Sequence, residues 1–542
     1  MRKRSFSYRA VLLTLFALLL AGLLSGCSPN WQDLTTEQKL EDFNFLFGIL
    51  KDNHPYLALK ARNEGYDWLS HEGEFEQAIR ESADDASFAQ AIAWMLRQVN
   101  NGHTNVLPAA SVQSTAGWNE KPWKDVARLT SEARMNYWYS LCYPPASVAS
   151  QGKYPPFLAI YNGGQYVVVR VAPEQAIQSY VQVGMTVLRV EDRPVREYVA
   201  AQRGSVHPYR VLYDPTQKCL YQRELVLPTE EESLSVTLRD AQGAVIEAQV
   251  PYASRTWDAT YPWPPKYADP GSPTPNLYTD ILAGGNVGYI RIASLLDRTE
   301  APVLRRFFES IRHLPALIID IRGNGGGLSS YWEQDIVGQL TPGPVDCDFY
   351  LTWRSGDYVQ PFVQAKMALM PLKVLSKTAL VEKAGSGLAG NIPPEVMTGD
   401  FVNPRVLTVG ATPRDSVNYR GRIFLLVDDR SYSAAEGFTA FCKASGFATV
   451  VGTWTGGDGI GFTPAEVVLP NSGMVVRFPL GMGLNPDFTA NEESHTLPHV
   501  FVEQNLDDIL VYMSKWASGA VSQPDPTYDA ALRRCLELAS GD

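Results

Sequence analysis

The chain has 542 residues, 45% of them hydrophobic and 19% charged, which is enough for roughly two to four globular domains. This composition excludes collagen, long disorder and a polytopic membrane protein. The formal net charge is −11, from 58 acidic and 47 basic residues. Because an acidic chain is repelled by phosphate backbones, we expect no nucleic-acid partner.

The N-terminus has the pattern of a targeting signal. Four basic side chains come first, namely Arg2, Lys3, Arg4 and Arg9. The apolar run that follows, 10–24, is too short for a comfortable membrane span. It ends in LSGC, which resembles the lipobox of bacterial lipoproteins. The resemblance implies a signal peptide over residues 1–27, lipidation of Cys27 and a membrane-anchored lipoprotein in the bacterial cell envelope. The alternative is an ordinary signal peptide with a chance cysteine.

The remaining cysteines do not form a disulfide framework. They are odd in number and far apart: Cys142, Cys219, Cys347, Cys442 and Cys535. An oxidising compartment would permit one pair, such as Cys142 with Cys219. The sequence contains neither Cys-x-x-Cys nor His-Glu-x-x-His, so we expect no metal site and no cofactor.

Residues 28–110 are predicted to form an N-terminal helical domain, followed by a connecting segment over 111–162. Apolar residues recur at helical spacing in two sets: Phe43, Leu46, Phe47, Leu50 and Phe88, Ile92, Leu96, Val99. We expect Asn101-Gly102 to end the second helix. His103 follows at once, and we expect it to be held by the helix end without being buried.

Residues 163–255 have the pattern of a small β domain, with predicted strands near 166–171, 183–190, 234–238 and 245–250. The order, with the stretch GMTVLRVEDRPV, resembles a PDZ domain. Such domains bind peptide C-termini by adding a strand to a sheet edge. A carboxylate-binding loop is not clear, however, and 200–230 has the pattern of an insertion. A β domain without a ligand is the alternative.

A Pro-rich linker, 256–284, precedes a predicted core over 285–515 and a C-terminal helical tail over 516–542. Predicted strands at 287–292, 316–321 and 421–427 alternate with helices at 302–313 and from 434, which is typical of a mostly parallel α/β fold. The strand at 316–321 is nearly all apolar, as in a sheet buried on both faces. Residues 340–415 have the pattern of an irregular inserted lobe.

Two strand-to-helix junctions carry candidate chemistry, DIRGNGGG (320–327) and DDRSYSAAEG (428–437). Glycines let backbone N–H groups approach a ligand, and a serine at a helix start lies in a positive potential. Together they could form an oxyanion hole and a nucleophile. Each alone is ambiguous: a glycine turn can cradle phosphate, although the P-loop lysine is missing here, and a serine that opens a helix is usually only a cap.

Four segments in order, VGYIRIASL, ALIIDIRGNGGG, FLLVDDRSYSAAEGF and ATVVGTWTGG, resemble the carboxyl-terminal processing peptidases, which include tail-specific and tricorn-like serine peptidases. The resemblance implies a multidomain α/β chain with a crotonase/ClpP-like core. It also implies a serine-type endopeptidase that cuts peptides, unfolded proteins or protein C-terminal tails through an acyl-enzyme on Ser433. The oxyanion donors would be the N–H of Ala434 and that of Gly325 or Gly326.

Two subtypes of the family differ in the base. Tail-specific members take a lysine from a Gly-Lys-Gly segment, but this chain has Gly457-Asp458-Gly459 there, and Lys443 cannot fold back along its own helix. Tricorn-like members use Ser/His/Glu, which implies His103 from the Gly-His-Thr segment. The third residue would be Glu492, counted back from the final proline motif, with Glu493 left open. A histidine oriented by a carboxylate is the base that a serine nucleophile needs.

Two other readings stay open. The same fold could serve as a catalytically inactive protein that binds a peptide or an apolar ligand. An esterase or amidase could use the same residues with a different pocket.

Overall fold

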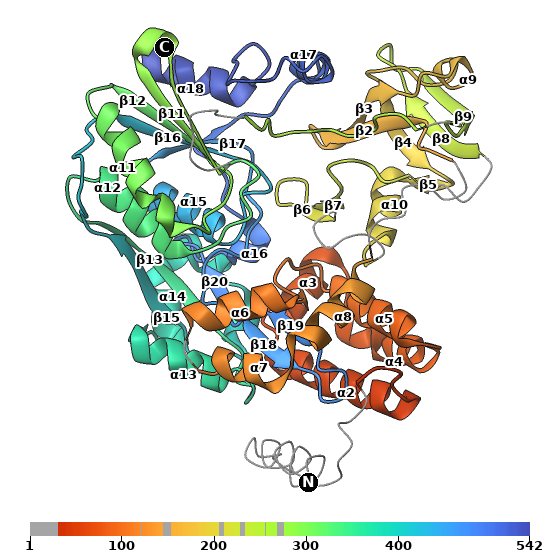
Figure 1. The fold of residues 1–542 in the computed structure, drawn as a ribbon, viewed down its shortest axis with the longest axis vertical. Helices are drawn as coiled ribbons and strands as arrows, with labels where there is room; N and C mark the ends of the chain where they lie inside the picture. The colour runs from red at the N-terminus through yellow and green to blue at the C-terminus, as the bar shows by residue number, and fades with distance from the viewer. Residues whose placement is uncertain are drawn as a thin grey trace.

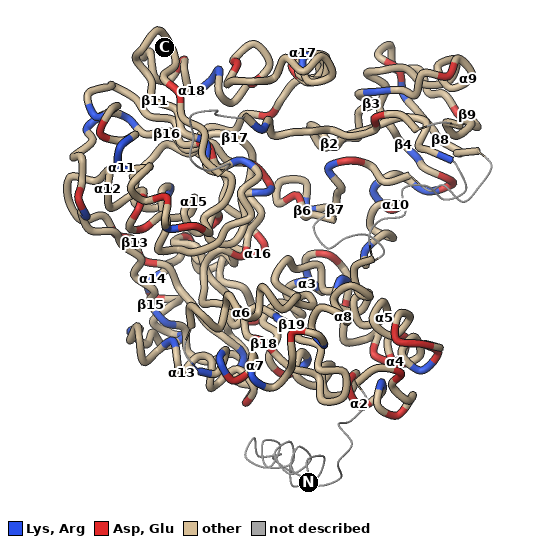
Figure 2. Tube along the Cα trace, viewed as in Figure 1, with Lys and Arg blue, Asp and Glu red and all other residues tan. Residues whose placement is uncertain are grey.

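The computed structural model describes residues 31–119, 121–144, 153–204, 211–227, 233–254, 256–267 and 276–541. The expected signal peptide and Cys27 lie outside these residues, so both stay predictions. Within the described ranges, no helix is long and apolar enough to cross a membrane. Lys/Arg and Asp/Glu residues are interspersed along the described part of the trace (Figure 2).

The N-terminal part is helical, as the apolar spacing predicted (Figure 1). Its helices are α2 (Thr36–Asn53), α3 (Leu57–Glu64), α4 (Glu72–Arg80), α5 (Asp85–Arg97), α6 (Ala109–Trp118), α7 (Trp123–Leu129) and α8 (Glu132–Cys142). Helices α6 to α8 fill half of the range 111–162. Their buried Val112, Trp123 and Trp138 join the same core as Phe43 of α2. The expectation of a connecting segment is therefore wrong, because these residues bury apolar surface with the first helices.

The turn after α5, which places His103, differs from the one expected. The helix ends at Arg97, and the left-handed turn residue is Asn100, with φ 55°, instead of Gly102. Beyond it, β1 (Asn105–Val106) pairs with β19 (Val475–Phe478), which also pairs with β18 (Ala465–Val468). This pairing fastens the helical part to the C-terminal region of the chain.

A separate β unit, defined here as the described residues between 153 and 254, stands beside the rest of the molecule (Figure 1). Its main strands run in the order β2 (Phe157–Asn162), β3 (Gln165–Val171), β4 (Thr186–Val190), β8 (Ser233–Arg239) and β9 (Val245–Pro251). The predicted strands are present. Helices α9 (Gln175–Gln178) and α10 (Val195–Ala201) flank them. The expected insertion forms a hairpin, β6 (Leu212–Asp214) and β7 (Cys219–Tyr221), which reaches toward the core.

The core holds a six-stranded sheet in the order β10 (Leu277–Leu282), β11 (Val287–Ile292), β12 (Ala316–Asp320), β16 (Arg422–Val427), β17 (Thr449–Gly452) and β21 (Val500–Phe501). Only the β10 pairing is antiparallel, so the sheet is mostly parallel, as expected. Strand β10 lies within the range expected to be linker, because its pairing partner β11 follows it directly along the chain.

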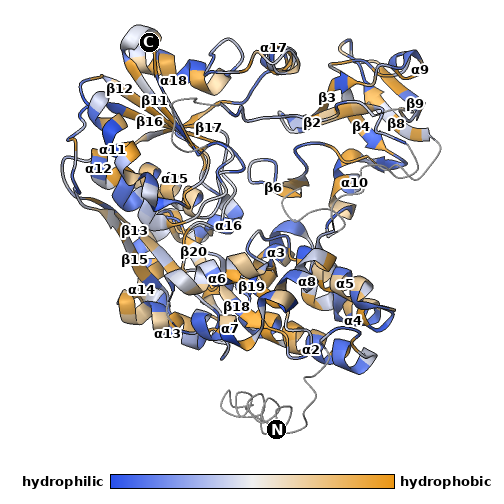
Figure 3. Cartoon of the chain, in the orientation of Figure 1, coloured by the Kyte–Doolittle hydropathy of each residue, from blue (hydrophilic) through white to orange (hydrophobic). Residues whose placement is uncertain are grey.

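Helices cover both faces of this sheet, whose strands are strongly hydrophobic in Figure 3. On one face lie α11 (Ala301–Ser310), the π-helical turn Tyr331–Val337 with α12 (Gly338–Leu340), and α15 (Ala434–Ser445). On the other lies α18 (Ala530–Ser540). The predicted helical tail, 516–542, contributes α18, whose Leu532 and Cys535 pack against the sheet. Helix α17 (Leu506–Ala517) packs instead beside β2 and β3.

The inserted lobe is regular, and the expectation of an irregular one is wrong. Its elements are β13 (Val345–Thr352), α13 (Gln360–Leu369), β14 (Lys373–Val374), α14 (Lys377–Leu388) and β15 (Arg405–Ala411). The strands form a sheet in the order β14-β15-β13-β20, completed by β20 (Met482–Leu484). Because β20 comes from far along the chain, local sequence gives little sign of this sheet.

The cysteines are free in the described residues, so the pair Cys142 with Cys219 is not formed. The thiol of Cys142 is buried and donates to the Ala89 carbonyl. Cys219 instead lies beside the Tyr161 hydroxyl in the β unit.

Candidate active site

Ser433 lies in a sharp turn between β16 and α15. It caps the helix with φ 57° and ψ −122°, a strained conformation for a residue with a Cβ. Such a strained strand-to-helix turn exposes a serine hydroxyl at the top of a sheet. Two hydrogen bonds hold this turn. The Ser431 hydroxyl donates to the Ile321 carbonyl, and the Tyr432 backbone N–H donates to the Asn324 carbonyl. The second strand-to-helix junction is thus bound directly to the first.

His103 reaches Ser433 from the helical part of the chain. The Asn101 side chain accepts from the His103 N–H at 2.9 Å and so shapes the loop after α5. A Cβ on Gly102 would lie 2.8 Å from the Tyr432 ring, so glycine permits the loop to approach the nucleophile turn. The imidazole packs on Tyr432 with ring centroids 4.9 Å apart. It is 9% exposed, hence buried, contrary to the expectation of a placed but unburied side chain.

Ser433, His103 and Asp458 form a continuous hydrogen-bonded chain. The Ser433 Oγ and His103 Nε2 atoms are 3.0 Å apart, and His103 Nδ1 lies 2.7 Å from Asp458 Oδ2. The expected contact of Ser433 with His103 is therefore present. The expected third residue is wrong, because Asp458, and neither Glu492 nor Glu493, holds the far nitrogen of the imidazole.

Asp458 is fixed by donors from three distant segments. Its Oδ1 accepts from the Tyr56 hydroxyl at 2.7 Å, and its Oδ2 accepts from Asn101 Nδ2 at 2.9 Å and the Tyr432 hydroxyl at 3.2 Å. Burial alone would raise the pKa of this carboxyl. The charge of His103 and these hydrogen bonds outweigh burial and hold the pKa of Asp458 below its ordinary value. The carboxylate is therefore ionised at neutral pH.

Glu492 and Glu493 have other partners. Glu492, on α16 (Asn491–Ser494), is 4% exposed and binds Lys60 Nζ at 2.7 Å. Lys60 also binds Glu64 at 2.9 Å, so this lysine lies between two carboxylates. Glu493 faces Arg62 at the surface, at 2.9 Å. Burial raises the pKa of Glu492 to about 7, against the charge of Lys60 and with a further contribution from Asp458.

The glycine-rich loop lies against the start of α15. A Cβ on Gly326, whose φ is 98°, would lie 2.7 Å from the Ala434 nitrogen, so the two backbones are in direct contact. The Gly326 N–H already donates to Asn324 Oδ1 at 2.9 Å. A Cβ on Gly325 would meet nothing within 4 Å, so this position faces open space. Because the Gly326 N–H is already engaged, Gly325 with Ala434 remains the candidate pair of oxyanion donors.

A buried ion network fixes the strand that leads into this loop. Arg322 forms ion pairs with Asp320 and Asp529, each at 2.7 Å, and all three side chains are almost fully buried. Asp428 then accepts from the Gly323 N–H at 2.7 Å. The loop is thus rigid before any substrate binds, as an oxyanion hole requires.

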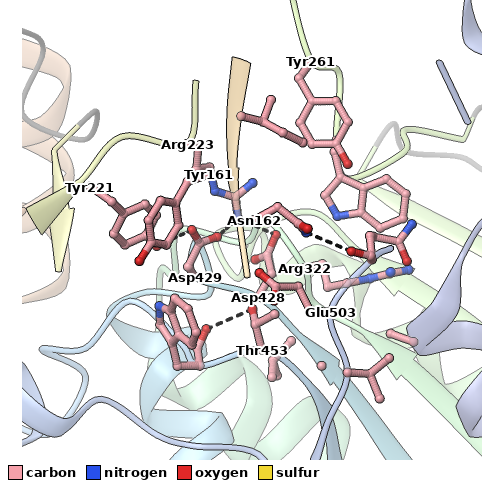
Figure 4. A pocket seen from close by; sticks show the side chains of 18 residues that line it. Tyr161, Asn162, Tyr221, Arg223, Tyr261, Arg322, Asp428, Asp429, Thr453 and Glu503 are labelled. Atoms are coloured by element: carbon pink, nitrogen blue, oxygen red, sulfur yellow. Dashed lines mark hydrogen bonds and ion pairs between the residues drawn. The ribbon is translucent and has the colours of Figure 1, made fainter. Parts of the chain in front are cut away.

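A small cavity lies apart from Ser433, His103 and Asp458. It has a volume of about 100 Å³ and is lined by residues of β2, β7, the 261–263 segment and the sheet ends. Figure 4 shows Tyr221, Arg223, Asp428 and Asp429 along its wall. Ser433, His103 and Asp458 do not line it. The chemistry therefore belongs to the serine turn and not to this cavity.

The described residues contain no group of three or more His, Cys, Asp or Glu side chains able to hold a metal ion. Lys443 on α15 donates to the Leu497 carbonyl at 2.7 Å, directed away from Ser433. A nucleophile, a base and an orienting carboxylate are nevertheless in place, and this constellation carries out acyl transfer.

The sequence contained one sign of Asp458. It stands where a dyad lysine was expected, and its acidic character was interpreted only as the loss of that lysine. A serine–histidine pair needs a carboxylate, so an acid in a glycine-flanked loop after the nucleophile helix was itself a candidate.

Residues 286–502 match the model of Peptidase family S41. This range is a peptidase family S41 domain. The match confirms the resemblance seen in the motifs and supports a serine peptidase function with a peptide or protein substrate. The S41 domain includes Ser433 and Asp458, whereas His103 comes from the helical part outside it.

Most of the chain is also similar to solved structures. Mature CPAF complexed with lactacystin is 17% identical with a TM-score of 0.49, covering 90% of this chain and 99% of that one. The photosystem II D1 C-terminal processing protease is 16% identical with a TM-score of 0.35, covering 86% and 94%. The tricorn protease is 17% identical with a TM-score of 0.27, covering 84% and 37%. No curated protein matches the chain in sequence.

Proposed function

We propose that this chain is a serine endopeptidase of the bacterial cell envelope that hydrolyses peptide bonds in peptides or protein C-terminal tails through an acyl-enzyme on Ser433. The observation that carries the chemistry is the continuous chain from Ser433 Oγ through His103 to Asp458. The lipobox ending in Cys27 motivates the location.

The geometry supplies each step of the reaction. His103 Nε2 takes the proton of Ser433 as Oγ attacks the scissile carbonyl, and returns it to the leaving amine. Asp458 stays ionised, holds the Nδ1 proton and stabilises the imidazolium. The Ala434 and Gly325 N–H groups would bind the oxyanion. Water then attacks the acyl group on Ser433, with His103 again acting as the base.

The test of the chemistry is labelling with a fluorophosphonate probe, which reacts with an activated serine. The full chain should be labelled, and Ser433→Ala and His103→Ala should not be. A panel of peptides and esters then separates a peptidase from an esterase. A chain that is labelled by no probe and cleaves no peptide would instead be the inactive binding protein.

The test of the location is Cys27→Ala. The lipobox predicts that cleavage and membrane attachment both depend on this cysteine. If the variant is processed and retained on membranes like the parent chain, the lipoprotein proposal is wrong.

A further inference from the structure

The β2 edge of the β unit already carries an extended segment of the same chain, joined to it by one β-bridge. In the resemblance to a PDZ domain, a peptide C-terminus would add to such an edge. Here residues 222–227 of the insertion, called the 222–227 segment below, run antiparallel to β2, with Glu224 opposite Ile160. The Tyr161 N–H donates to the Arg223 carbonyl and the Leu225 N–H to the Ala159 carbonyl, each at 2.9 Å.

Side chains of helix α10 bind the other side of this segment. The Tyr198 hydroxyl and Gln202 Nε2 both donate to the Val226 carbonyl, at 3.0 and 3.2 Å. Gln222 is anchored in turn, since its N–H donates to the Tyr166 hydroxyl at 2.7 Å. The segment is therefore bound on both sides, by a strand edge and by a helix.

Its apolar side chains fill the interior of the β unit. Leu225 and Leu227 are each 6% exposed and pack in the core of this unit. They alternate with more exposed residues, as in a strand that has one buried face. This is how a bound peptide would insert alternate side chains into pockets.

Arg223 of the segment and the preceding residue, Tyr221, contact the nucleophile turn. Arg223 forms an ion pair with Asp428 at 3.0 Å and another with Asp429, and the Tyr221 hydroxyl donates to Asp429 at 2.5 Å (Figure 4). Asp428 in turn holds Gly323 of the glycine-rich loop. Releasing the segment would therefore also release contacts that support the turn before Ser433.

We propose that the 222–227 segment is the permanent occupant of the groove between β2 and α10, so that the β unit does not bind the C-terminal carboxylate of a substrate. An attached segment competes at an effective concentration on the order of millimolar, which a free peptide in dilute solution does not reach. Peptides or protein tails would then be cut without recognition of their free C-terminal carboxylate by the β unit. The statement about substrates rests on the proposed function, whereas the statement about the groove does not.

The first experiment measures binding and needs no catalysis. The full-length Ser433→Ala variant is titrated into fluorescein-labelled peptides of random sequence that end in an apolar residue, either as the free carboxylate or as the amide. Fluorescence anisotropy should give affinities equal within about twofold. Binding that is tenfold or more tighter for the free carboxylate would overturn the proposal. The result is informative even if the chain cleaves nothing.

The second experiment locks the groove. Ile160 and Glu224 are a non-hydrogen-bonded antiparallel pair, the closer kind, so the double variant Ile160→Cys/Glu224→Cys is suited to form a disulfide. The oxidised and reduced forms should cleave both amidated and free peptides with kcat/KM values equal within about twofold, and the parent chain with and without reductant is the control. A loss of tenfold or more on oxidation, restored by reduction, would show that the groove must open and would contradict the proposal. Absence of cleavage in every form would count against the proposed function instead.

Discussion

Asp458 and Glu492 are two buried carboxylates that interact electrostatically with each other, yet their surroundings differ. Asp458 receives hydrogen bonds from His103, Tyr56 and Asn101, which hold its pKa below the ordinary value. Burial raises the pKa of Glu492 to about 7, and its ion-pair partner is Lys60. The comparison teaches that the donors converging on a carboxylate, more than its position in a motif, decide which one orients the base.

The largest expected effect tests whether Asp458 belongs to one unit with the nucleophile. Ser433→Ala should lower kcat by about a million-fold, because residues that act in one concerted step fail together. Adding His103→Ala or Asp458→Asn to Ser433→Ala should cost almost nothing more. Single-turnover cleavage of a fluorogenic peptide measures these losses. If the losses in kcat multiplied in the double variant that carries Asp458→Asn, Asp458 would act independently of Ser433 and His103.

The direct comparison comes from replacing each carboxylate by its amide. Asp458→Asn should lower kcat about 10,000-fold, since an amide holds the imidazole in the wrong tautomer. Glu492→Gln should cost tenfold or less, about 1.4 kcal/mol of activation free energy, because it does not contact His103. Steady-state kcat on the same peptide shows which carboxylate orients His103. The reverse order of effects would restore Glu492 as the orienting residue.

A smaller effect is expected at the glycine-rich loop. Gly326→Ala places a methyl group against the Ala434 nitrogen and the Tyr432 carbonyl, each 2.7 Å from the new carbon, and so displaces the loop. Disturbing an oxyanion donor typically costs about 100- to 1,000-fold in kcat. Gly325→Ala is the matched control, because its added methyl meets open space and its N–H remains. Equal kcat in the two variants would exclude the contact with Ala434 as the reason for glycine at 326.

The smallest expected effect is on stability. The pKa of Glu492 is about 7 in the folded chain, above its ordinary value of 4.5. The folded state therefore binds more protons than the unfolded state between these values, and the free energy of unfolding falls as the pH rises through this window. Glu492→Gln has no proton to lose at this position. Over the same pH range its free energy of unfolding should therefore fall by roughly 1–3 kcal/mol less than that of the parent chain.

Urea unfolding at about pH 5 and about pH 8 measures this difference. Glu493→Gln is the control on the same helix, because Glu493 lies nearer the surface and pairs with Arg62. Its stability curve should run parallel to that of the parent chain. A Glu492→Gln curve that is also parallel to the parent would mean that this carboxyl does not titrate over the window.

Much of the site could be predicted from local sequence. The buried strand before Gly323, the serine that opens α15 and the histidine after α5 are each set by short-range patterns of apolar spacing, glycine and helix starts. The contact between Ser433 and His103 was expected from these patterns together with the family resemblance. The helical part beyond residue 110 and the lobe sheet were missed, because their cores and strand partners come from distant segments.

By itself the sequence determined the fold class, the nucleophile turn and the glycine-rich loop, because each depends on neighbours along the chain. Only the tertiary structure decided that Asp458 orients His103, since Tyr56, Asn101 and Asp458 come from three separate segments that converge on one buried spot. It also decided that the β2 edge is filled by the chain itself. Hydrogen bonding and burial in a folded interior depend on what lies nearby in space, and a motif states only what lies nearby in the chain.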